Sequence, residues 1–156
     1  MAFEGGNRGN RAASMGKRKP IAVELGRVLL VEDEPLIALE LEDALREGGA
    51  SEVLRCASIA ETMRELEGNP PDVVILDVHL ADRDDGWALA ELVGQLGART
   101  PQIVFSTGAP QDIPPEIAEM GLVFAKPYNP DDLVAALKAA ARPSRGRLLG
   151  RLRDAL

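Results

Sequence analysis

The chain has 156 residues, a hydrophobic content of 46% and a formal net charge of −7 at pH 7. This length accommodates one domain with a buried core and is short for two ordinary domains. The sequence contains no run of about 18 apolar residues, so no stable insertion into a membrane is expected. The single cysteine, Cys56, cannot form an internal disulfide, which fits a reducing cytoplasm, and its place on a predicted strand assigns it to the core.

Charge is distributed unevenly along the chain. Residues 1–26 and 143–156 each carry a net charge of +3, whereas residues 27–142 carry −13. An acidic body of this kind disfavours nucleic acid as a partner of the folded domain. Since Trp87 and Tyr128 are the only residues of their kinds, the chain also lacks an aromatic platform for single strands. Residues 1–26, rich in Gly, Asn, Arg and Lys, are interpreted as a disordered basic arm.

Aliphatic runs alternate with helical patterns across residues 27–142. The predicted strands cover residues 28–31, 53–54, 73–77, 103–106 and 123–125. The predicted helices begin at Pro35, after a capping box formed by Ser58 and Glu61, at Gly86, at Pro115, and after the capping residue Asn129. The first of these helices is expected to end at Gly48 and to bury Leu36, Leu39, Ala44 and Leu45, with Ile37 and Leu41 widening the stripe. Five strands alternating with five helices predict a doubly wound α/β domain with a parallel sheet and helices on both faces.

Acids follow the first and third predicted strands. In the strand order 2-1-3-4-5, these two strands flank the point where the order reverses, and ligands bind there outside the carboxyl ends of the strands. Three carboxylates held together repel one another unless a cation joins them, and a hard ion such as Mg²⁺ suits oxygen ligands. The fourth and fifth strands add hydroxyls and an ammonium group to the same edge. The residues concerned are Glu32, Asp33, Asp77, Ser106, Thr107 and Lys126. Together they form a set suited to phosphoryl transfer, with an acid as the nucleophile.

The motif order resembles the receiver domain of two-component response regulators. It consists of Val-Leu-Leu-Val before Glu32 and Asp33, Val-Ile-Leu before Asp77, Ser-Thr-Gly at residues 106–108, and Lys-Pro at residues 126–127. The resemblance covers residues 27–142 and implies a flavodoxin-like five-stranded sheet.

The resemblance also implies a role for each residue at the edge. Asp77 is the expected phospho-acceptor, Thr107 senses the phosphoryl group and Lys126 pairs with it. Asp33 is expected to bind Mg²⁺ directly, together with Asp77 and the backbone carbonyl of His79, while Glu32 acts largely through water. A cis peptide is expected before Pro127.

Three features depart from most receivers. Ala81 stands where a proline is usual, and Gly86 comes one residue later than the usual glycine. Val123, followed by Phe124, stands where a switch aromatic is expected, so the signal is expected to pass through the loop of residues 108–115. The Phe-Ser-Thr-Gly stretch at residues 105–108 is similar to the Phe-Ala-Thr-Gly stretch of stand-alone receivers in the alphaproteobacterial general stress response. This similarity favours Thr107 over Ser106 as the switch hydroxyl, a choice that the residues alone leave open.

The resemblance implies a single-domain response regulator that takes phosphoryl from a histidine kinase, or from a histidine phosphotransferase, onto Asp77. It would act through protein contacts or as a phosphate sink or relay, with self-catalysed transfer and dephosphorylation instead of metabolic catalysis. Since few residues follow Arg142, no DNA-binding output domain is expected. The alternative is a receiver-fold binding module that works without phosphorylation.

Residues 143–156 form a basic tail with leucines expected along one side and arginines around the other. The tail is interpreted as lying on its own acidic domain; the alternatives are a dimer contact or a membrane-surface element. Two glycines weaken any helix in it.

Overall fold

The computed structural model describes residues 25–81, 86–95 and 100–140. The strands are β1 (Gly26–Val31), β2 (Ala50–Cys56), β3 (Val73–Asp77), β4 (Gln102–Thr107) and β5 (Leu122–Ala125). The helices are α1 (Pro35–Glu47), α2 (Ile59–Gly68), α3 (Val78–Ala81), α4 (Gly86–Gly94), α5 (Pro115–Ala118), the 3-10 turn η2 (Pro110–Asp112) and a helix over residues 130–140. The predictions for the basic tail and for nearly all of the basic arm lie outside the described residues.

All five strands are parallel and follow the order β2-β1-β3-β4-β5, which confirms the predicted topology. The central strand β3 is buried at every position. Helices cover both faces of the sheet, so this strand reads as a continuous hydrophobic run and shows no alternation with polar residues. The carboxyl ends of β1 and β3, where the strand order reverses, lie next to each other because Val31 pairs with Leu76.

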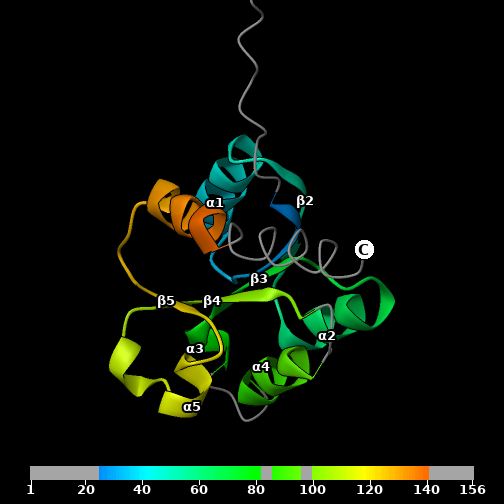
Figure 1. Ribbon diagram of the computed structural model, residues 1–156, viewed down its shortest axis with the longest axis vertical. Coiled ribbons are helices and arrows are strands. Elements are labelled where there is room, and N and C mark those ends of the chain that lie inside the picture. Colours follow the sequence, from blue (N-terminus) through cyan, green and yellow to red (C-terminus); the bar gives the residue numbers. More distant parts are fainter. Residues whose placement is uncertain (1–24, 82–85, 96–99, 141–156) are drawn as a thin grey trace, which may run out of the picture.

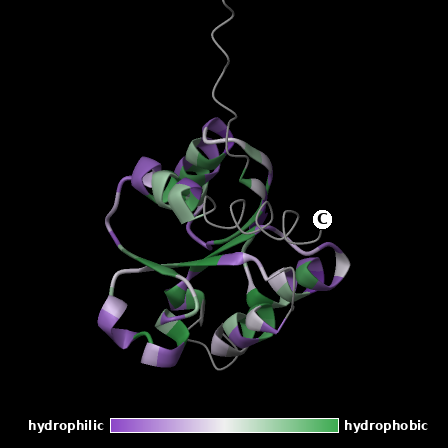
Figure 2. Ribbon diagram, in the orientation of Figure 1, coloured by the Kyte–Doolittle hydropathy of each residue, from purple (hydrophilic) through white to green (hydrophobic). Residues whose placement is uncertain are grey.

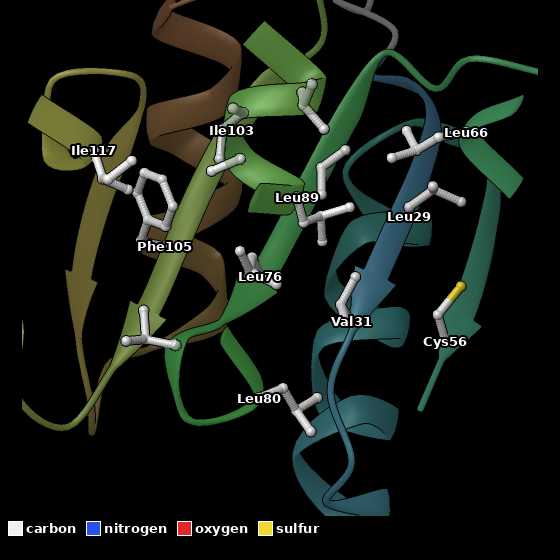
Figure 3. Packing of buried hydrophobic residues seen from close by; sticks show 14 of the residues in the cluster. Leu29, Val31, Cys56, Leu66, Leu76, Leu80, Leu89, Ile103, Phe105 and Ile117 are labelled. Atoms are coloured by element: carbon white, nitrogen blue, oxygen red, sulfur yellow. The ribbon is translucent and has the colours of Figure 1, made fainter. Parts of the chain in front are cut away.

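Helices cover the sheet in two layers. Figure 1 shows α1 and the helix of residues 130–140 on one face of the sheet, with α2, α3, α4 and α5 on the other. Strands appear as the most hydrophobic elements in Figure 2, while the helices carry both kinds of residue. Alternate residues of β1, β3 and β4 enter different cores. Leu29, Leu76 and Phe105 belong to the cluster under α2 and α4, as Figure 3 shows, whereas Leu30 and Ile75 belong to the cluster under α1.

The buried face of α1 differs from the prediction. The helix begins and ends where expected, but its buried residues are Ala38, Leu41, Ala44 and Leu45. Leu36 is 72% exposed and Leu39 is 48% exposed, so the prediction that both are buried is wrong. The apolar residues of α1 span a wider arc than the sheet can cover. At 100° per residue, Leu36 and Leu39 lie on the side of the helix opposite Leu41 and Leu45.

Local signals fixed several other boundaries. Ser58 accepts a hydrogen bond from the backbone N–H of Glu61, and the Glu61 carboxylate accepts one from Ala57, which confirms the predicted start of α2. The Asn129 side chain accepts a hydrogen bond from Asp131 at the start of the helix of residues 130–140. Helix α4 begins at Gly86, as predicted. Helix α3 is a single turn where a loop was expected, and four residues are too few to carry a periodic signal.

Two further predictions concern single features. Cys56 is free and only 1% exposed, so its assignment to the core is confirmed. Among the described segments, no helix has the length and apolar character that crossing a bilayer requires.

Candidate functional site at the carboxyl edge of the sheet

Three carboxylates meet where β1 and β3 end. Glu32 and Asp33 follow β1, Asp77 is the last residue of β3, and each can place one oxygen within 4.8 Å of the others. Glu32 and Asp77 are 5% and 4% exposed, whereas Asp33 faces solvent. The sheet itself fixes Glu32, because its backbone N–H continues the ladder by donating to Cys56 of β2. The predicted convergence of these acids is therefore present in the structure.

One oxygen of each buried acid is held by the backbone. The N–H of Glu34 donates to Oε1 of Glu32 at 3.0 Å, and the N–H of His79 donates to Oδ1 of Asp77 at 2.9 Å. The other oxygens face the Lys126 ammonium group. Nζ lies 3.2 Å from Oε2 of Glu32 and 3.6 Å from Oδ2 of Asp77. Lys126 thus reaches the acids from the end of β5, as the sequence predicts.

Charge and burial act against each other in this cluster. Burial is the main cause that raises the pKa of Glu32, and the charge of Asp77 adds to it, while the Glu34 N–H and Lys126 offset part of the shift. Burial alone would lower the pKa of Lys126, but the charges of Asp77 and Glu32 outweigh it and raise that pKa. Lys126 is therefore cationic at neutral pH and neutralises one of the three carboxylates.

The donor set fits a hard divalent cation. It consists of clustered carboxylate oxygens from Glu32, Asp33 and Asp77, without sulfur or imidazole nitrogen. With Lys126 included, the ionised cluster keeps two negative charges, which a single Mg²⁺ ion would balance.

The two neighbouring hydroxyls of β4 take different places. Thr107 lines a cavity of about 370 Å³ together with Asp77, Lys126 and Asp33, and its Oγ1 accepts a hydrogen bond from the Ala109 N–H at 2.9 Å. Ser106 is not among the residues that line this cavity, and its hydroxyl lies 2.8 Å from the hydroxyl of Tyr128. Of the two hydroxyls, only that of Thr107 belongs to a residue that lines the cavity beside the acid cluster.

His79 and Trp87 also line this cavity, which we call the acidic cavity. The His79 side chain is exposed, and its backbone N–H orients Asp77. Trp87 lines the acidic cavity from α4 and contacts the ring of Phe105 at a centroid distance of 6.5 Å. The sequence prediction did not include Trp87 in the site, although its place directly after the delayed Gly86 puts it at the start of a helix facing this edge. The peptide between Lys126 and Pro127 is cis, as predicted.

Comparison with known proteins identifies the family. The model of the response regulator receiver domain matches residues 28–138. The chain belongs to this family. Its receiver domain has the fold of the CheY-like receiver domain from Methylobacillus flagellatus, with a TM-score of 0.61 and 22% identity over 73% of this chain and 99% of that one.

Two curated relatives have similar sequences. Transcriptional regulatory protein PdtaR of Mycobacterium tuberculosis is 32% identical over 73% of this chain and 56% of its own length. Phyllosphere-induced regulator PhyR of Methylorubrum extorquens is 32% identical over 72% of this chain and 42% of its own length. A solved structure of the PhyR stress response regulator matches the receiver domain with a TM-score of 0.54 and 26% identity, over 72% of this chain and 43% of that one. The chain thus spans about half the length of these curated relatives.

Proposed function

We propose that the receiver domain accepts a phosphoryl group from a histidine kinase onto Asp77 and later loses it by hydrolysis. One observation carries the proposal: the buried Asp77 carboxylate has one oxygen held by the backbone and the other 3.6 Å from the Lys126 ammonium, inside an acid cluster that suits Mg²⁺. This arrangement orients the carboxylate toward the acidic cavity, as a nucleophile requires.

The residues divide the chemistry among them. An Asp77 oxygen forms the new bond to phosphorus while the bond from phosphorus to the imidazole nitrogen of the donor breaks, and the imidazole leaves with the bonding electrons. Asp33, Asp77 and the carbonyl of His79 would hold Mg²⁺, with Glu32 acting through water, and the ion would supply positive charge for the phosphoryl oxygens. Lys126 supplies a second positive charge, and the Thr107 hydroxyl donates a hydrogen bond to the transferred group.

Output follows from the added charge. A phosphoryl group adds about −1.5 to −2 charges at pH 7. Once Thr107 and Lys126 engage it, the loop after β4 gains a new set of contacts, which a protein partner can read. We propose that the receiver domain works through such partners or as a sink or relay for a shared kinase. Its similarity to PhyR supports a place in a stress response.

Transfer of label from a phosphohistidine donor tests the proposal. Purified protein with Mg²⁺ and a radiolabelled phosphorylated kinase should gain an acid-stable, base-labile label, and Asp77→Asn should gain none. Asp132→Asn, an exposed acid on the helix of residues 130–140, serves as the matched control and should be labelled like the wild type. Label that persists in Asp77→Asn contradicts the assignment. Wild-type protein that binds Mg²⁺ but takes no label favours the phosphorylation-independent binding module.

A further inference from the structure

A hydrogen bond between two hydroxyls joins the end of β4 to the segment that follows β5. The hydroxyls of Ser106 and Tyr128 lie 2.8 Å apart. Ser106 is 1% exposed and Tyr128 is partly buried. The Tyr128 ring packs edge-on against Phe124 of β5, with the ring centroids 5.4 Å apart. This contact fixes the ring, so the hydroxyl can meet Ser106 at little further cost in conformational entropy.

The two residues flank the phosphoryl-binding pair. Ser106 immediately precedes Thr107, and Tyr128 comes two residues after Lys126. The backbone N–H of Lys126 also donates to the carbonyl of Thr107 at 2.7 Å. Two hydrogen bonds therefore tie the segment of residues 126–128 to the end of β4, one through the backbone at its start and one through a side chain at its end.

The orientation of the Lys126 side chain depends on the segment of residues 126–128. Its side chain is long, 25% exposed, and held at its tip by the same acids that a phosphoryl group will compete with. Pro127 and Asn129, on either side of Tyr128, are both exposed. Among the side chains of residues 127–129, Tyr128 is the one that hydrogen-bonds to the sheet.

We propose that Tyr128 is a positioning residue for phosphoryl transfer, which acts through Ser106 to hold the segment of residues 126–128 against β4 so that the Lys126 ammonium stays aimed at Asp77. The inference rests on the proposed function. It assigns a role to the hydroxyl of Ser106, the position where this chain departs from the Phe-Ala-Thr-Gly stretch that it resembles.

The ionisation of Tyr128 is compatible with this role. Burial raises the pKa of the Tyr128 hydroxyl, although the hydrogen bond with Ser106 and the charge of Lys126 offset part of the shift. The hydroxyl therefore keeps its proton at neutral pH, and either partner can donate in the Ser106–Tyr128 pair.

The test removes one hydroxyl at a time. Tyr128→Phe, Ser106→Ala and the double variant are compared with the wild type, each also in a Lys126→Ala background. Thr62→Val is the matched control, because it removes a buried hydroxyl that donates to the backbone carbonyl of Ser58 at the start of α2, away from the site. Two quantities are measured: the initial rate of phosphorylation by acetyl phosphate, and the affinity for beryllofluoride, an anion shaped like a phosphoryl group. Mg²⁺ affinity is followed in parallel by the fluorescence of Trp87.

Each single variant should lower the phosphorylation rate and the beryllofluoride affinity about threefold to tenfold, the range that one neutral hydrogen bond covers. Mg²⁺ affinity should not change. The double variant should show the same rate and beryllofluoride affinity as each single variant, because each single substitution already removes the one Ser106–Tyr128 hydrogen bond. In the Lys126→Ala background, neither substitution should have a further effect. Thr62→Val should lower the thermal midpoint without changing either quantity.

Three results would overturn the inference: wild-type rates in Tyr128→Phe, an equal loss of Mg²⁺ affinity, or an undiminished effect in the Lys126→Ala background. In all three cases the wild-type protein is still labelled on Asp77, so the proposed function stands. A wild-type protein that takes no label overturns both.

Discussion

Lys126 is the counter-ion of two buried acids. Its ammonium lies within 3.6 Å of oxygens from both Glu32 and Asp77, and the pKa of Glu32 is raised even with this neighbour in place. A phosphoryl group on Asp77 would draw Lys126 toward itself and away from Glu32. That movement would leave the buried Glu32 carboxylate without its ion-pair partner. Neutralising the acids therefore requires both Lys126 and a bound cation.

Replacing Lys126 by Met should make the protein less stable at neutral pH than at acidic pH. Glu32 loses its ammonium partner, so its pKa should rise further above the ordinary value of 4.5. As the pH rises above that ordinary value, Glu32 ionises in the unfolded chain before it ionises in the folded protein. The folded state then binds more protons, so the free energy of unfolding falls until the pH passes the folded pKa.

Urea unfolding of Lys126→Met at pH 5, 6 and 7 without Mg²⁺ measures this effect. The loss of stability relative to the wild type should grow from pH 5 to pH 7. Lys138→Met, a partly exposed lysine on the helix of residues 130–140, is the control and should show no such trend. A constant difference between Lys126→Met and the wild type across these pH values would mean that Lys126 does not compensate the charge of Glu32.

The parts of the site that the sequence predicts share one cause. Strand ends can be located from aliphatic runs, and parallel strands bring their carboxyl ends together, so the convergence of Asp33, Asp77 and Lys126 follows from topology. The hydrogen bond between Ser106 and Tyr128 joins residues 22 positions apart, and neither residue belongs to a pattern that records the contact. Contacts of this kind depend on the direction of side chains after the backbone is placed.

At the scale of single elements, α1 combines a well-predicted extent with a wrongly predicted face. Pro35 and Gly48 mark its ends by backbone chemistry that does not depend on the neighbours. The buried face depends on where the sheet lies. Since α1 has apolar residues on nearly every side, its sequence does not indicate which side is buried. Strand β2 shows the reverse case: it runs from Ala50 to Cys56, longer than the predicted pair of residues, because the polar residues of an edge strand hide its length.

The exposed leucines of α1 stand beside the acidic cavity. Asp33 and Glu34, which line the cavity, directly precede the helix, and Leu36 and Leu39 lie in its first two turns. We expect a phosphohistidine donor to approach Asp77 past this end of α1. Leucines that are 72% and 48% exposed would gain by burial against such a donor, so we expect both to contact the proposed kinase.

Substituting both leucines by Glu should therefore separate two kinds of phosphorylation. Transfer from a kinase should slow by about tenfold or more, because each Leu buried at an interface contributes about 1.5–3 kcal/mol at most. Labelling by acetyl phosphate should stay near the wild-type rate, since a small donor needs only the cavity.

A control variant places one such negative charge elsewhere. Val123→Glu alters a residue of β5 that is 37% exposed, and it should leave kinase transfer near the wild-type rate. Equal slowing with both donors in Leu36→Glu/Leu39→Glu would show that the substitutions disturb the site itself. Unchanged kinase transfer would remove α1 from the docking surface.

At the scale of the whole molecule, the acid cluster opposes the stability that the two cores provide. Helix layers on both faces of the sheet bury Leu29 and Phe105 on one side and Leu30 and Ile75 on the other. The same sheet ends on three clustered carboxylates within a body of net charge −13. Folding therefore concentrates negative charge at the edge where β1 and β3 end, and a cation bound there should stabilise the entire fold.

Mg²⁺ should accordingly raise the midpoint of thermal unfolding in a saturable way. A ligand that binds only the folded state adds about 1.4 kcal/mol for each tenfold excess over its dissociation constant. The same titration should change the fluorescence of Trp87, which lines the acidic cavity, with the same midpoint. In Asp33→Asn, half of the thermal stabilisation and half of the fluorescence change should be reached at a higher Mg²⁺ concentration. Asp43→Asn alters an exposed acid on α1 and should leave both of these Mg²⁺ concentrations unchanged. NaCl at equal ionic strength separates site binding from screening. If NaCl reproduces the stabilisation, the acid cluster is not a specific cation site. The proposed role of Mg²⁺ in phosphoryl transfer is then contradicted.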